Sequence, residues 1–304
     1  MIRSIQSEKI TWIDIQDPAE KDIQFLEQNF DFHPMVLGEL IPPGSRPKVE
    51  HHDDYLFFIL YYPVFDKIKK ETGRRELDII VTKTHIVTSH YETILPLRAL
   101  FDQANLYEQG KKEYMSETTG HLLYYIIAGI LQGTFQKTEE LEKEIDKLEK
   151  EIFRNREKEM VFALSELARD AIDVRRILAP HRSTFESLIK EGSSFWGEEL
   201  LPYFEDLRGT FANIWNEIEE HRETLQSLAN TNESLLRAKS NEIMQVLTIF
   251  SVVFLPLTLI ASIWGMNTAY LPFTDLSYDF WIITGIIASA FAGMMWYFRT
   301  RKWL

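Results

Sequence analysis

Residues 241–267 read NEIMQVLTIFSVVFLPLTLIASIWGMN, and this stretch decides the fold class. Residues 243–264 carry no charged side chain, and neither do residues 280–298. Each segment is about the 20 residues that an α-helix needs to cross a hydrocarbon core of roughly 30 Å. The sequence therefore predicts two transmembrane helices near the C-terminal end, joined by an outer loop over residues 265–279.

Charge asymmetry around the two spans predicts their orientation. The outer loop holds Asp275 and Asp279 and no lysine or arginine. Basic side chains flank the opposite ends of the spans: Arg237 and Lys239 before the first, and Arg299, Arg301 and Lys302 in the basic tail 299–304. Because lysine and arginine accumulate on the cytoplasmic side, we expect both termini in the cytoplasm and the chain in the cell (inner or plasma) membrane. The N-terminus lacks the pattern of a secretory signal, which agrees with this orientation.

The composition limits the classes of partner. The chain has 304 residues, 45% of them apolar, a formal net charge of −13 and no cysteine. The acidic balance argues against nucleic acid, which requires an extended basic face. The lack of cysteine excludes disulfides and thiolate zinc sites. The sequence also shows no glycine-rich phosphate loop and no nucleophile beside a base, so we expect no enzyme.

Hydrophobic periodicity divides the remaining chain into three parts. Residues 1–115 mix short β-rich runs with helical stretches and predict a cytoplasmic α/β domain; the strands are expected at 10–15, 55–65, 77–82 and 85–89, and the helices at 21–29, 34–40 and 96–106. Residues 116–201 predict a helical hairpin that turns near Asn155. A stalk helix over 202–242 then continues into the first span as one helix of about 60 residues.

At intervals of three and four, the first span presents a set of residues that includes an amide and four hydroxyl side chains. They form one stripe of residues: Asn241, Met244, Thr248, Ser251, Leu255, Thr258 and Ser262. Small and hydroxylated side chains let transmembrane helices pack closely, so the stripe is consistent with plain helix packing. A single hairpin cannot enclose a water-filled pore, so a conducting stripe requires several subunits around one axis.

The end of the first span reads Trp264, Gly265, Met266, Asn267, and here the sequence resembles the CorA family of magnesium channels, whose hallmark is the Gly-Met-Asn triplet. The triplet stands after a polar-striped span and before a short acidic loop, a second span and a basic C-terminus, as in that family. Residues 241–262 and 33–60, the latter reading HPMVLGELIPPGSRPKVEHHDDYLFFIL, extend the similarity. The resemblance thus spans nearly the whole chain.

The resemblance implies an α+β/α membrane protein: an N-terminal α/β domain, a long helical hairpin, a stalk helix and two C-terminal transmembrane helices, assembled as a funnel-shaped homopentamer. It implies transport of Mg²⁺, with cobalt as a further cargo, and no organic cofactor. Gly265, Met266 and Asn267 would form the selectivity filter. Met244 and Leu255 would form an apolar constriction that closes by dewetting.

Magnesium chemistry agrees with this assignment. Mg²⁺ dehydrates reluctantly and is better recognised through its waters. A ring of Asn267 carbonyl oxygens could accept hydrogen bonds from those waters, and neutral amides at Asn267 and Asn241 bind weakly enough to release the ion.

Family members also sense cytoplasmic Mg²⁺ through acids between neighbouring subunits. Asp206 matches the sensing aspartate by its distance from the first span, and Asp66 is a candidate for its partner. Bound ions would bridge like-charged surfaces and hold the closed state. The alternative is that both are solvated surface acids, in a chain with 46 Asp and Glu.

Several positions depart from the family pattern or imitate a metal site. Trp264 replaces the usual tyrosine, Ser262 a glycine, and the outer loop has lost most of its acids. Four adjacent residues, His51, His52, Asp53 and Asp54, have metal-binding chemistry, but neighbours on an extended strand point to opposite faces.

Two other functions compete with the magnesium channel. A zinc transporter of the ZntB type shares the architecture but differs at the position of Met266. A membrane-tethered sensor or scaffold would conduct nothing, and replacing Asn267 would leave ion flux unchanged.

Overall fold

The computed structural model describes residues 2–41, 44, 46–66, 71–154, 156–267, 272, 278–301 and 303; the side chains of Asp66 and Asp279 lie outside this description. The chain forms two compact units, Met1–Ala229 and Asn230–Leu304. The division into domains predicted from the sequence stays a prediction.

The first unit contains a mixed sheet of six described strands in the order β1-β2-β6-β5-β4-β3. The strands are β1 (Ile2–Gln6), β2 (Thr11–Gln16), β3 (Lys48–His51), β4 (Tyr55–Asp66), β5 (Glu71–Thr82) and β6 (His85–His90). Only β2 and β6 pair in parallel, and the other described neighbours are antiparallel. The four strands expected from the sequence are confirmed with shifts at their ends.

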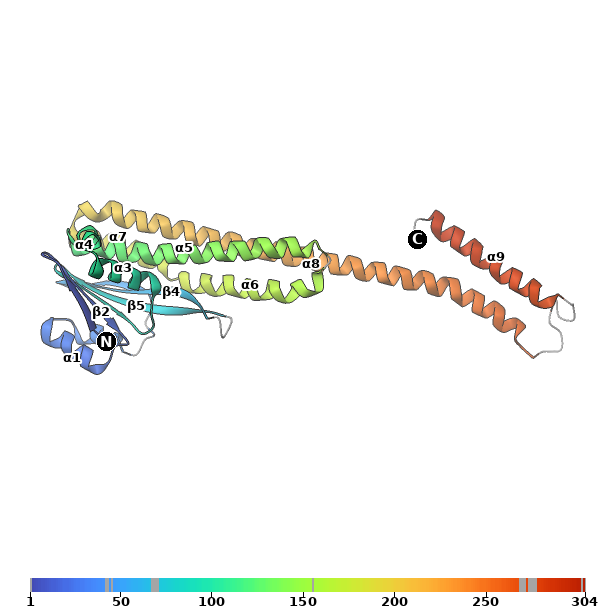
Figure 1. Cartoon of the computed structure of the whole chain (residues 1–304), viewed down its shortest axis with the longest axis horizontal. Coiled ribbons are helices and arrows are strands. Elements are labelled where there is room, and N and C mark those ends of the chain that lie inside the picture. Colours follow the sequence, from blue (N-terminus) through green and yellow to red (C-terminus); the bar gives the residue numbers. More distant parts are fainter. Residues whose placement is uncertain are drawn as a thin grey trace. The chain divides into compact units, whose positions relative to one another are not determined.

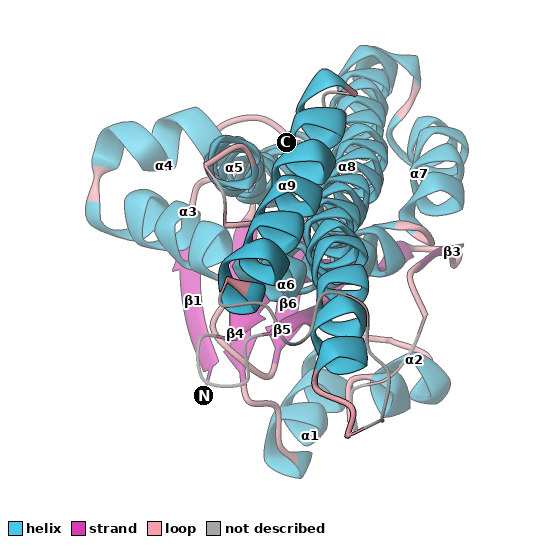
Figure 2. Ribbon diagram, turned by 90° about the vertical axis from the view of Figure 1, so that its right-hand side faces the viewer, coloured by secondary structure: helices cyan, strands magenta, loops and turns pink. Residues whose placement is uncertain are grey.

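Helices cover both faces of this sheet (Figures 1 and 2). On one face lie α1 (Glu20–Asn29) and α2 (Pro34–Glu39), where Leu26 and Leu37 share a buried cluster with Phe57. On the other lie α3 (Leu95–Leu106), α4 (Glu108–Met115) and the longer helices, with Phe101 packed edge-on against Trp12 at 5.0 Å. Both faces are buried there, which explains the nearly continuous apolar run in β4 and the apolar second half of β5.

Sequence periodicity missed three elements within residues 1–115. β1 and β3 are short and polar, and they become strands by pairing with β2 and β4. α4 reads EQGKKEYM, in which apolar residues are too few to give a helical period. Tertiary pairing therefore decides these elements.

The helical region contains three helices rather than the two expected. They are α5 (Thr119–Ile152), α6 (Glu157–Leu178) and α7 (His181–Trp196). Pro180 stands between α6 and α7, and proline disfavours a continuous helix because it lacks a backbone donor. The expected turn near Asn155 falls between α5 and α6, although Asn155 itself lies outside the described residues.

A helix of 64 residues, α8 (Leu201–Trp264), follows a short 3₁₀ turn at Glu198–Leu200. The prediction of one uninterrupted helix of about this length is confirmed. In the second unit, α8 packs against α9 (Asp279–Thr300) through Ile249, Val253 and Phe298. Two described helical stretches are long and apolar enough to cross a membrane. They are Glu198–Trp264, which is the 3₁₀ turn together with α8, and Phe280–Thr300 in α9.

Candidate functional site

The Gly-Met-Asn triplet follows the last residue of α8 directly. The Gly265 amide donates to the Ala261 carbonyl at 3.0 Å, and the Met266 amide donates to the Ile263 carbonyl at 3.3 Å. A Cβ at position 265 would lie 3.3 Å from the Ala261 carbonyl oxygen. Glycine therefore lets the chain close tightly over the helix end.

Asn267 is exposed immediately beyond this turn. The C-terminal end of a helix carries a partial negative charge from its last carbonyls, which favours cations within about one turn. Trp264 Nε1 donates to the Pro272 carbonyl at 3.0 Å and ties the helix end to the following loop. The site thus combines an amide side chain with a carbonyl-rich helix end.

The polar stripe of α8 lies on the face opposite to α9. Ile249 and Val253, with Leu257, face α9. At about 100° per residue, the seven stripe positions spread over roughly 100° of arc, centred about 180° from Val253. In this chain Met244 is 57% and Leu255 is 70% exposed. Packing against α9 therefore does not account for the stripe.

Three of the four hydroxyl groups of the stripe donate into their own helix. Thr248 bonds the Met244 carbonyl at 2.7 Å, Ser251 the Leu247 carbonyl at 2.9 Å, and Thr258 the Phe254 carbonyl at 2.8 Å. A hydroxyl whose proton is engaged still offers oxygen lone pairs. The stripe therefore presents hydrogen-bond acceptors, which suits the protons of water molecules around a cation.

Asp206, the predicted sensing acid, lies exposed near the start of α8. Its Oδ2 accepts a hydrogen bond of 2.9 Å from the Tyr124 hydroxyl of α5. Burial, together with this hydrogen bond and the charge of Asp206, raises the pKa of Tyr124 to about 12. Tyr124 is therefore a neutral donor near pH 7. Sequence reasoning missed Tyr124, because this contact joins residues 82 positions apart.

Asp66, the predicted partner acid, ends β4 and pairs with Glu71 of β5. The adjoining Phe65 ring lies 4.8 Å from the amine of Lys137 on α5. Tyr124 and Lys137 are 137 − 124 = 13 residues apart on α5, or about 20 Å. Within one chain the two acids therefore lie at different levels of the helical bundle.

Of the two acids predicted for the outer loop, the structure describes only the backbone of Asp279. Asp275 lies outside the described residues, and Asp279 begins α9 without a described side chain. Their role stays a prediction.

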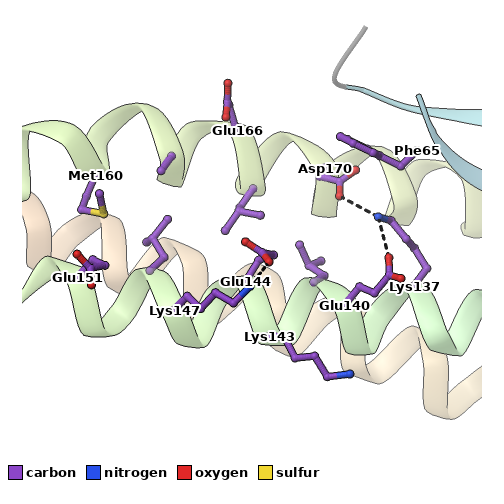
Figure 3. A pocket seen from close by; sticks show the side chains of 14 residues that line it. Phe65, Lys137, Glu140, Lys143, Glu144, Lys147, Glu151, Met160, Glu166 and Asp170 are labelled. Carbon is purple, nitrogen blue, oxygen red and sulfur yellow. Dashed lines mark hydrogen bonds and ion pairs between the residues drawn. The ribbon is translucent and has the colours of Figure 1, made fainter. Parts of the chain in front are cut away.

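A groove of about 830 Å³ lies between α5 and α6 (Figure 3). Its lining includes apolar side chains such as Leu141 and Leu148, and several of its charges form pairs within the groove. Lys147 contacts Glu144 at 2.6 Å, and Lys137 lies 3.6 Å from Glu140 and 3.9 Å from Asp170. These carboxylates already have cationic partners, so the groove lacks the character of an ion site.

The adjacent residues His51 and His52 have different partners. His51 Nδ1 lies 3.1 Å from Glu191, whereas the His52 ring stacks on Tyr55 at 4.5 Å. Among the described residues, no three side chains of histidine, aspartate or glutamate are grouped so that they could hold a metal ion.

The fold and the site together define a membrane protein with a large folded unit and two C-terminal candidate spans, the first of which carries a polar face. A family model described as CorA-like Mg²⁺ transporter protein matches residues 7–301. The chain belongs to this family, which comprises transporters and not enzymes.

Known proteins agree with this assignment. The cobalt/magnesium transport protein CorA of Thermotoga maritima is 30% identical over 295 residues, covering 97% of this chain and 83% of that protein. The complete structure of the CorA magnesium transporter from Methanocaldococcus jannaschii superposes with a TM-score of 0.86 at 23% identity, covering 99% and 94% of the two chains. The zinc transport protein ZntB of Yersinia enterocolitica is 21% identical, covering 98% of this chain and 89% of that protein.

Proposed function

We propose that this chain conducts hydrated Mg²⁺ down its electrochemical gradient through a homopentameric pore in the cell membrane, with both termini in the cytoplasm. The observation that carries the proposal is the Gly265–Met266–Asn267 triplet at the end of α8, in register with a polar stripe that faces away from α9. A stripe that α9 does not cover is free to line an axis shared with other copies.

The chemistry of this face suits a hydrated ion. Mg²⁺ keeps several waters, and these waters donate hydrogen bonds. Asn267 and Asn241 offer amide oxygens at the two ends of the stripe, and the hydroxyls between them are held as acceptors. Neutral acceptors bind weakly enough for the ion to leave, which conduction requires.

Met244 and Leu255 are the apolar members of the same face. In a closed assembly, their side chains would converge and exclude water from the path. Polar rings would then hold the ion on either side of an apolar gate.

Internal Mg²⁺ would close the channel by binding between neighbouring subunits. Asp206 is exposed and available for such a contact, with Asp66 of an adjacent copy as the proposed second acid. A divalent ion bridging two carboxylates stabilises only the arrangement in which they meet, so its loss would release the closed state.

The test is Mg²⁺ flux into liposomes that contain the purified chain. We expect Asn267→Ala to reduce flux by at least about tenfold without loss of oligomer, because the filter would lose its acceptors. The matched control is Asn105→Ala, an exposed asparagine on α3, which should conduct like the wild type. Unchanged flux in Asn267→Ala would remove the pore role and favour a non-conducting scaffold.

Zinc transport is the second candidate, favoured by the similarity to ZntB over nearly the whole chain. Met266 supports magnesium, because the resemblance implies another residue at this position in zinc transporters of the ZntB type. Equal gradients of Mg²⁺ and Zn²⁺ in the same liposomes separate the two functions, and zinc-preferring flux would replace the magnesium assignment.

A further inference from the structure

Tyr124 packs beside the proposed sensing acid. Its ring lies between two other tyrosines, with edge-on contacts to Tyr203 at 5.1 Å and to Tyr125 at 5.4 Å. Tyr203 stands one turn before Asp206 on α8, so the same helix supplies the packing surface and the acceptor. These ring contacts hold the Tyr124 hydroxyl on the side of the carboxylate.

The hydrogen bond from Tyr124 occupies one oxygen of the Asp206 carboxylate. Its length is 2.9 Å, and among the described residues no other side chain bonds Asp206. A hydrogen bond to a charged acceptor stabilises the charged, ion-free carboxylate. A cation, or a water in its shell, that approaches the same oxygen must displace or share this donor.

We propose that Tyr124 is a positioning residue that competes with the regulatory divalent cation for Asp206 and thereby raises the internal Mg²⁺ concentration needed for closure. This inference rests on the proposed role of Asp206 as the sensing acid. Tyr124 sets the threshold of the response, while Asp206 provides the charge.

The variant Tyr124→Phe tests this competition because it removes only the hydroxyl. The ring still packs between Tyr125 and Tyr203, so the fold and the maximal flux at low internal Mg²⁺ should remain. We expect the half-inhibitory internal Mg²⁺ concentration to fall about threefold to tenfold, equivalent to about 0.7–1.4 kcal/mol. An unchanged or higher half-inhibitory concentration would overturn the inference.

Two further variants separate this inference from the proposed function. Tyr125→Phe removes a neighbouring hydroxyl that makes no described bond to Asp206, and its inhibition curve should match the wild type. Asp206→Ala should weaken inhibition by itself, and Tyr124→Phe should add nothing in that background. If Asp206→Ala leaves inhibition unchanged, the sensing role fails; if it weakens inhibition but Tyr124→Phe has no effect, only the role of Tyr124 fails.

A binding measurement gives a readout independent of flux. Mg²⁺ that binds the folded assembly raises its unfolding temperature in a concentration-dependent way. For Tyr124→Phe this rise should begin at a Mg²⁺ concentration about threefold to tenfold lower than in the wild type. A curve that coincides with the wild type would contradict the competition even if the flux of the variant were too low to measure.

Discussion

The two ends of α8 expose opposite kinds of side chain. Toward the N-terminal end, Phe211 and Ile214 are buried, at 3% and 0% exposure. Toward the C-terminal end, Phe250 is 59% and Val246 is 62% exposed. One helix geometry therefore serves two surroundings, because water drives apolar side chains inward whereas lipid accepts them.

The two units also differ in their polar groups. The first unit buries titratable side chains such as His181 and Asp78 among tertiary partners. The stripe of the second unit carries only an amide, hydroxyls and apolar side chains. The folding of the first unit should therefore depend on pH, whereas the stripe has no group that titrates.

The largest effect should come from truncating a phenylalanine on the buried side of α8. Phe211→Ala should destabilise the detergent-solubilised protein by about 3–5 kcal/mol, because it leaves a cavity in the core. Phe250→Ala, the same change at an exposed position, should cost less than about 1 kcal/mol. Chemical unfolding followed by tryptophan fluorescence measures both, and equal losses would contradict the contrast between the two ends.

A lysine placed on each end of α8 should have the opposite pattern of cost: small at the N-terminal end and large at the C-terminal end. Val252→Lys, at the middle of the first span, should oppose membrane insertion by about 3 kcal/mol, since a charged side chain is costly at the centre of the bilayer. Ala212→Lys, on an exposed position of the first unit, should stay within about 0.5 kcal/mol of the wild type. Membrane fractionation and carbonate extraction provide the readout. Normal insertion of Val252→Lys would show that this surface meets water and not lipid.

His181 should make the first unit sensitive to acid. Its Nε2 accepts the Tyr61 amide at 2.9 Å, and burial lowers the pKa of His181 to about 4. Because the folded pKa lies below the unfolded value of about 6.5, the unfolded state takes up the proton first. The stabilisation is complete above pH 6.5 and declines as the pH falls toward 4, by about 3 kcal/mol in total.

Unfolding midpoints between pH 7 and pH 4 measure this loss. His181→Gln keeps an acceptor but cannot titrate, so its stability should change less over the same range. A variant that loses as much stability as the wild type would assign the acid sensitivity to other groups.

The smallest effect concerns Asp78, whose Oδ1 is buried without a hydrogen-bond partner in the described structure. Burial, with a further contribution from Glu76 and Glu39, raises the pKa of Asp78 well above its usual value. A raised carboxyl pKa lowers stability as the pH rises above the unfolded value of about 4. Asp78→Asn should therefore stabilise the protein by about 1 kcal/mol at pH 8 and little at pH 4. Asp53→Asn, at an exposed position, is the matched control and should change neither value.

Sequence reasoning succeeded where the signal is local. The spans follow from uncharged segments long enough to cross a bilayer, and α8 follows from a stretch in which the few glycines and prolines do not break the helical period. Sequence reasoning failed where strand pairing decides the secondary structure. Residues 2–6 carry little β signal, and they form a strand because they pair with β2. Pro180 is a visible signal for the break between α6 and α7, and a prediction from the helical period alone does not include it.

The sequence by itself determined the two candidate spans, the polar stripe, the Gly-Met-Asn triplet after the first span and the family, since each of these depends on residues close together in the chain. Only the tertiary structure decided that the stripe lies opposite to α9 and that Tyr124 bonds Asp206. Both depend on which helices lie side by side, and that is set by the burial of apolar faces from segments far apart in the sequence.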